Sequence, residues 1–146
     1  MFVPNAYISE YMALLGSKVG TANSTPLVMT YVQPVGRRVL LIASLGDMAN
    51  ETIDIAIYKA SDASATGAAS LKAATQLAAS ATANDNKQVY IDLAEQEMDT
   101  AKPFLAGRCV TSGATGGVVS LTLLQTLWRE QNVLDVHNAS LVQIKR

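Results

Sequence analysis

The sequence predicts an all-β protein, folded as a two-layer antiparallel β-sandwich (jelly-roll or immunoglobulin-like) of about seven or eight strands. Two segments, Glu51–Lys59 and Gln88–Leu93, alternate strictly between apolar and polar side chains. A period of two describes a strand with one face in a core and the other facing out. Between such segments lie runs of Gly, Ala, Ser, Thr and Asn, which are typical of turns.

Strands are expected wherever an apolar or alternating segment lies between two groups of turn-forming residues. In chain order these segments are Leu27–Gln33, Arg38–Leu45, Glu51–Lys59, Ser70–Ala78, Gln88–Leu93, Phe104–Thr111 and Val118–Leu124. Turns are expected at Pro34–Gly36, Gly46–Asn50, Ser61–Gly67, Asn84–Asn86 and Ser112–Gly117, the last as a flexible hairpin turn. The alternation then directs one set of side chains into a common core: Ile53, Ile55, Ile57, Val89, Ile91, Leu93, Leu121 and Leu123.

Two segments depart from this pattern. Ala94–Ala101 does not alternate, and we expect a single helical turn that crosses from one sheet to the other, with Met98 against the core. Pro103 prevents that helix from continuing into the next strand. The stretch Ala60–Ala83 is rich in Ala, Ser and Thr and could be a helix, but Thr75 and the small side chains favour a strand.

The two ends of the chain are expected to form arms on a domain at residues 26–125. In the first arm, residues 1–25, the segment Ile8–Leu15 could make two helical turns, capped by a serine and ended by a glycine. The second, residues 126–146, regains strand character at Ser140–Lys145. This segment is either a final core strand or an arm that adds to the sheet of a neighbouring molecule.

The composition indicates a protein that contacts other proteins. A chain of 146 residues is long enough to form one domain that buries roughly 70% of its unfolded surface. Charged residues make up 16% of it, below the usual quarter. A small neutral soluble domain is the alternative reading. With 11 basic and 12 acidic residues, and no basic cluster larger than Arg37–Arg38, we expect no direct nucleic-acid partner.

The sequence also predicts where the protein resides. Its longest apolar run, Val39–Ala43, is far shorter than a membrane span, so no membrane partner is expected. The start of the chain lacks the basic region and apolar stretch of a secretory signal. We therefore expect the protein to stay in a cytoplasm, or in a particle assembled there.

Few residues are suited to catalysis. The single cysteine, Cys109, cannot form an internal disulfide and is expected to be a buried, inert thiol. The single histidine, His137, lies near a terminus and is expected at a surface or interface. One Cys and one His cannot build an ordinary zinc site, and the acidic groups Asp92–Asp99 and Asp47–Asp54 lack the spacing of a calcium loop. We expect no catalytic residue, no metal and no cofactor.

Three phrases of the sequence, Ala56–Gly67, Lys72–Leu77 and Asn86–Asp99, resemble a group of small virion proteins of tailed bacteriophages and prophages. The resemblance covers residues 50–125. It implies a β-sandwich capsid decoration (cement) protein of the virion, which binds the major capsid protein, stabilises the head and carries no catalytic residue. A head–tail connector or tail component, and a small carbohydrate- or protein-binding sandwich, are the alternatives.

The terminal arms are expected to carry the residues that bind partners. Aromatic and Arg side chains concentrate binding energy when an interface buries them. On this ground the candidate anchors are Tyr7, Tyr11, Trp128 and Arg129. Self-association as a dimer or trimer is expected from the decoration role, because a protein with many identical neighbours is accommodated by closed oligomers. The alternative for Trp128 is that it closes the open end of the sandwich.

Overall fold

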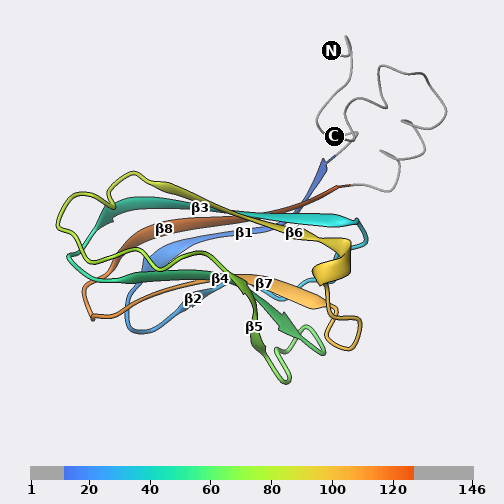
Figure 1. Ribbon diagram of the computed structural model, residues 1–146. Coiled ribbons are helices and arrows are strands. Elements are labelled where there is room, and N and C mark those ends of the chain that lie inside the picture. Colours follow the sequence, from blue (N-terminus) through green and yellow to red (C-terminus); the bar gives the residue numbers. More distant parts are fainter. Residues whose placement is uncertain (1–11, 127–146) are drawn as a thin grey trace, which may run out of the picture.

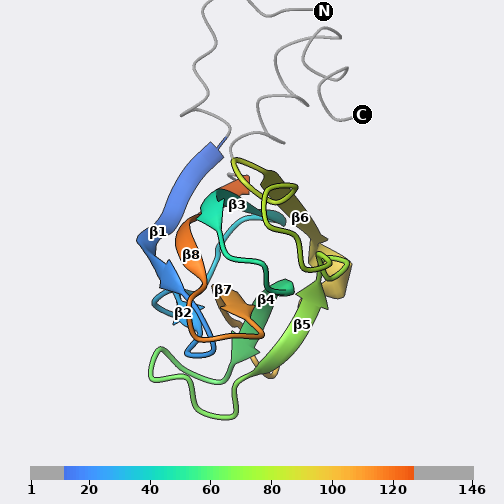
Figure 2. The ribbon, with the colours of Figure 1, turned by 90° about the vertical axis from the view of Figure 1, so that its left-hand side faces the viewer.

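The computed structural model describes residues 12–126, and it confirms the predicted all-β sandwich (Figure 1). Two four-stranded antiparallel sheets lie face to face. The first sheet has the strand order β1 (Met12–Ala22), β8 (Gly117–Thr126), β3 (Arg38–Met48) and β6 (Gln88–Ala94). The second has the order β2 (Leu27–Val28), β7 (Phe104–Thr111), β4 (Ile53–Ala60) and β5 (Ala69–Ala73). Figure 2 shows the two layers nearly end-on.

The predicted core lies between the two sheets. Seven of the eight side chains expected to face inward are buried, and Val89 is partly buried against them. Gly107 of β7 shows how closely the sheets approach, because a Cβ at this position would lie 2.5 Å from Leu41 Cδ1 of β3. The alternation of β3, β4, β6 and β8 therefore follows the burial of one face of each strand.

The crossing from β6 to β7 also follows the prediction. A short 3-10 helix, η1 (Glu95–Glu97), leads from β6 in the first sheet towards β7 in the second. Met98, directly after it, is partly buried against the core. Within Ala60–Ala83 the chain forms β5 and one isolated bridge from Leu77 to Ile53, and not a helix.

The helical turns predicted at Ile8–Leu15 are wrong for the part of that segment that is described. Residues from Met12 onward form β1, which pairs with β8 along its length, so residues 12–22 belong to the sandwich and not to an arm. A bulge between Leu14 and Gly16 breaks the period of two, which hides the strand in the sequence. Gly20, in the middle of β1, lets the other layer approach, since a Cβ there would lie 2.8 Å from Leu27 Cδ1.

Three local expectations also need correction. The glycine-rich segment Ser112–Gly117 is not a hairpin turn: it joins β7 of the second sheet to β8 of the first. Strand β3 continues through Met48, into the turn expected at Gly46–Asn50. The predicted strand Leu27–Gln33 is reduced to β2 and a single bridge at Val32, although Leu27, Met29 and Tyr31 are buried at every second position.

Candidate protein-binding surface

The predicted anchors Tyr7, Tyr11, Trp128 and Arg129, together with His137, lie outside the described residues. What the structure does describe is where the adjoining strands end. Met12 pairs with Thr126, so β1 and β8 reach the same end of the first sheet side by side (Figure 1). The two chain segments that carry the predicted anchors therefore continue from neighbouring strands.

The most distinctive surface of the described chain is the side of the first sheet that faces away from the core. We call it the outer face. The outward positions follow from the alternation of burial and from the strand register. They include Leu14, Ser17, Val19 and Thr21 of β1, Val118, Ser120, Thr122 and Leu124 of β8, Arg38, Leu40, Ile42, Ser44, Gly46 and Asp47 of β3, and Gln88, Tyr90 and Asp92 of β6.

Apolar side chains form connected rows across the outer face. Leu14 is opposite Leu124, which in turn is opposite Leu40. In the next row Ile42 is opposite Tyr90. Among the described residues five large hydrophobic side chains are exposed, and four of them lie on this face: Leu14 (61%), Val19 (67%), Tyr90 (58%) and Val118 (54%). The remaining one is Val35, at 63%, in the segment before β3. Apolar surface is thus concentrated on one side of the sandwich.

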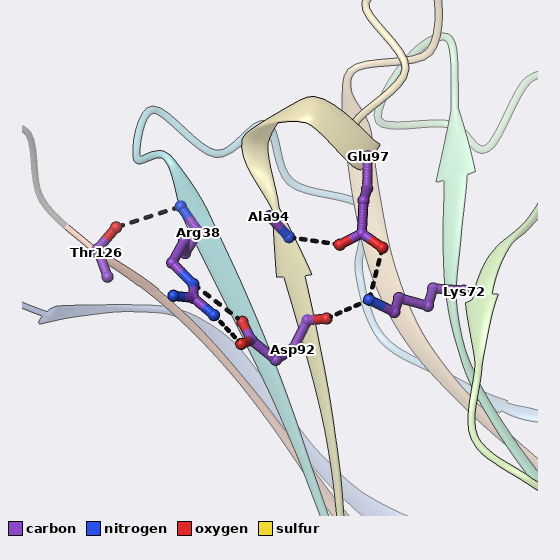
Figure 3. A network of polar contacts seen from close by, with 6 residues as sticks. All are labelled: Arg38, Lys72, Asp92, Ala94, Glu97 and Thr126. Carbon is purple, nitrogen blue, oxygen red and sulfur yellow. Dashed lines mark hydrogen bonds and ion pairs between the residues drawn. The ribbon is translucent and has the colours of Figure 1, made fainter. Parts of the chain in front are cut away.

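Charged side chains lie at the two ends of the outer face. At one corner the guanidinium of Arg38 of β3 donates to both carboxylate oxygens of Asp92 (Figure 3). At the other end of β3, Asp47 is exposed in the bulge that lies opposite Val118. The opposite side of the sandwich differs. There the guanidinium of Arg108 lies 4.6 Å from the centre of the Tyr58 ring, and the carboxylate of Asp54 accepts from Gln76 at 2.9 Å. The two outward surfaces of the molecule therefore have different chemistry.

The acidic group around η1, which the sequence singled out, forms ion pairs with Lys and Arg side chains. Each of its carboxylates contacts a cation on another element, which attaches the crossing between the sheets to both layers. The pairs are Asp92 with Arg38, Glu95 with Arg37 at 3.6 Å, Glu97 with Lys72 at 2.7 Å and Asp99 with Lys59 at 2.7 Å.

Lys72 is the centre of this network (Figure 3). From β5 in the second sheet, its Nζ donates to Glu97 Oε1 and to the backbone carbonyl of Asp92, each at 2.7 Å. The second carboxylate oxygen of Glu97 accepts from the backbone N–H of Ala94 at 2.8 Å. These hydrogen bonds, that from Lys72 first, lower the pKa of Glu97. The hydrogen bond from Lys59 likewise lowers the pKa of Asp99.

Glu51 organises the glycine-rich connection between β7 and β8. Its carboxylate accepts from the Thr111 hydroxyl at 2.5 Å and from the backbone N–H groups of Thr115 at 3.1 Å and Gly116 at 3.0 Å. The bond from Thr111 is the main reason that the pKa of Glu51 is lowered. This carboxylate is thus a structural clamp on a loop that crosses between layers.

Cys109 is buried on the inner side of β7, as predicted. Its burial raises the pKa of the thiol to about 12, so the nucleophilic thiolate is scarce at neutral pH. Within residues 12–126, no group of three or more His, Cys, Asp or Glu side chains could hold a metal ion. No helix in the same range is long and apolar enough to cross a membrane.

Sequence reasoning missed the outer face, although the signal was present. A strand with one solvated face alternates, whereas a strand covered on both faces reads as a continuous apolar run. Val39–Ala43 is such a run, and Leu40 and Ile42 within it are outward. Leu123 and Leu124 give β8 the same feature, because the first is inward and the second outward.

No protein-family model matches the sequence, and no curated protein matches it. Among solved structures, the chain is similar to one from Bacillus endospore appendages, described as a novel family of disulfide-linked pili. The two align with a TM-score of 0.46 and 11% identity over 80% of this chain and 87% of that chain. Similarity at this level carries no conclusion about function.

Proposed function

We propose that this protein is a non-catalytic structural subunit of a bacteriophage virion, a decoration protein that binds the major capsid protein and stabilises the head. The observation that carries the proposal is the outer face of the first sheet. Four exposed hydrophobic side chains and the central Leu40, Ile42 and Leu124 lie on it. Exposed apolar side chains gathered on one side of a protein mark contact with other protein.

The segments that resemble phage virion proteins support the same role. They include most of β4, the turn after it, the end of β5, and all of β6 and η1, and so contribute to both sheets. Several of their polar side chains serve the fold: Asp62 accepts from the backbone N–H groups of Ser64 and Thr66, and Lys72 binds Glu97. The resembling residues thus maintain a rigid sandwich, which is what a subunit that reinforces a shell requires.

In this proposal the major capsid protein is bound through the terminal segments. They extend from the adjoining ends of β1 and β8, and they carry Tyr7, Tyr11, Trp128 and Arg129. Two segments that start side by side on one rigid body bind together more tightly than either does alone, because the second contact is intramolecular. The protein assembles in the host cytoplasm and ends in the capsid.

The experiment that tests this function is a copy count on purified phage particles, by quantitative mass spectrometry against the major capsid protein. A decoration protein is expected in numbers comparable to the capsid subunits. A count equal to a single ring would instead indicate a head–tail connector, and absence from the particle would reject a virion role.

A second test addresses the anchors. Trp128→Ala and deletion of residues 1–11 are each expected to lower the occupancy of particles while the circular dichroism of the sandwich stays unchanged. The deletion ends at residue 11 because Met12 already belongs to β1. Parental occupancy with both variants would show that the capsid is bound elsewhere.

A further inference from the structure

The outward positions of β3 and β8 have the composition of a covered surface. On an antiparallel sheet with one solvated side, outward residues are polar. Here the central strands instead present Leu40, Ile42 and Leu124 outward, in register with Leu14 of β1. We propose that the outer face binds the outer face of a second copy of this chain. The proposal rests on the protein-binding role inferred above and names the partner of the same surface.

The charge distribution favours a second copy over a charged partner. In a twofold-symmetric interface the same patch meets itself, so unpaired charges of one sign would oppose each other. At one corner the outer face avoids this, because Asp92 and Arg38 neutralise each other within one molecule. Asp47 lies at the far end of β3, and the rows between the two ends are apolar or uncharged polar, with serine and threonine hydroxyls at Ser17, Ser44 and Thr122.

The size of the face is also suitable. Four strands spaced about 4.8 Å apart, with about eight residues each at about 3.3 Å, give a flat area of roughly 500 Å² before side-chain relief is added. Because side chains protrude from the sheet, the accessible area is larger than this flat value. It approaches the roughly 800 Å² that each partner contributes to a specific interface. Stacking two such faces repeats the sheet-on-sheet packing of the sandwich itself, at a spacing of about 10 Å.

The test uses the full chain in solution without capsid, with mass measured by sedimentation equilibrium. Two exposed members of the face are changed, in Val19→Glu and Val118→Glu. Val35→Glu is the matched control, because Val35 is as exposed as Val19 (63% against 67%) but lies off the face. We expect the parent and Val35→Glu to self-associate equally. Each face variant should weaken self-association by about tenfold or more, because identical charges then meet across the interface.

A cross-link gives a second readout that does not depend on affinity. Thr122→Cys places one thiol near the middle of the outer face, and Ser70→Cys places one on β5 in the other sheet. Cys109 is buried and does not compete for the reagent. With a short bismaleimide, Thr122→Cys is expected to give a covalent dimer, and Ser70→Cys to give no more than the background of the parent.

Three outcomes would overturn the proposal. A monomeric parent whose face variants unfold at lower temperature would indicate that the chain covers its own outer face. A monomeric parent whose face variants instead lose capsid occupancy would make the capsid protein the occupant. A parental oligomer that Val19→Glu and Val118→Glu leave intact would place the self-contact elsewhere. The decoration role is judged separately, since the copy count and Trp128→Ala address the particle and not the free protein.

Discussion

Cys109 lies on the inner side of β7, opposite Ile55 of β4, with no exposure to solvent. Its position between the layers, and not its sequence neighbours, determines its chemistry. Because burial holds the pKa of the thiol at about 12, we expect essentially no reaction with Ellman's reagent at pH 8 in the native protein. In denaturant one thiol per chain should react at once. Rapid reaction of the folded protein would show that β7 opens readily or that Cys109 is not between the sheets.

A second prediction about single residues concerns the buried isoleucines. Ile55 in the second sheet and Ile91 in the first are 2% and 4% exposed and meet in the same core. Ile55→Ala and Ile91→Ala should each lower the free energy of unfolding by about 2–5 kcal/mol, because the cavity left behind adds to the lost transfer energy.

Val35→Ala is the control for these two variants, since its side chain is largely in solvent and the expected change is within about 0.5 kcal/mol. Urea unfolding at low protein concentration measures all three. Equal midpoints for the control and the two core variants would contradict the assigned inward faces.

Among the elements of the fold, η1 is the one whose attachment depends most on the ionisation of its side chains. Glu97 has a lowered pKa because Lys72 and the Ala94 N–H bind its carboxylate. A carboxylate with a lowered native pKa contributes stability that is fully present above its unfolded pKa and is lost as the pH falls through the native value. The unfolded value for Glu is 4.5. The attachment of η1 to β5 should therefore be complete at neutral pH and weaken below pH 4.5.

Melting curves between neutral and acidic pH test this attachment. Glu97→Gln and Lys72→Met should each lower the melting temperature at neutral pH, and the difference from the parent should shrink in acid, where Glu97 of the parent is protonated as well. Lys87→Met is the matched control: its Nζ contacts the uncharged Asn84 side chain at 3.2 Å, so its effect should not follow this pH dependence. A difference between parent and Lys72→Met that stays constant with pH would refute an ionic attachment.

For the whole molecule, the two outward surfaces predict how self-association responds to salt. The rows between the two ends of the proposed interface are uncharged, and Asp92 and Arg38 at one corner are paired within one chain. Raising the salt from about 0.01 M to about 1 M shortens the screening length from about 30 Å to about 3 Å. Because no charge crosses the interface, the dissociation constant should stay constant or fall over this range. Dissociation of the oligomer by salt, followed by sedimentation, would instead indicate an electrostatic interface.

The fold class, the strictly alternating strands and the inward set of side chains could all be predicted from the residues alone. These features are predictable because each of these strands has one buried side and one open side. An apolar side chain is therefore required at every second residue. Phe104–Thr111 has the predicted bounds, and the crossing at η1 lies where alternation stops. The burial of Cys109 could also be predicted, since the segment around it is apolar.

The role of β1, the partners of the acidic residues and the outer face depend on contacts between elements that are distant in the chain. A bulge at Leu14 and Gly16 hides the alternation of β1, and its pairing with β8 joins residues about a hundred positions apart. The cations that bind Glu97 and Asp99 come from β5 and β4, elements that no local spacing connects to η1. Leu40, Leu124 and Leu14 become one apolar row only when three strands are placed side by side, because a surface is a property of neighbours in space and not of neighbours in the chain.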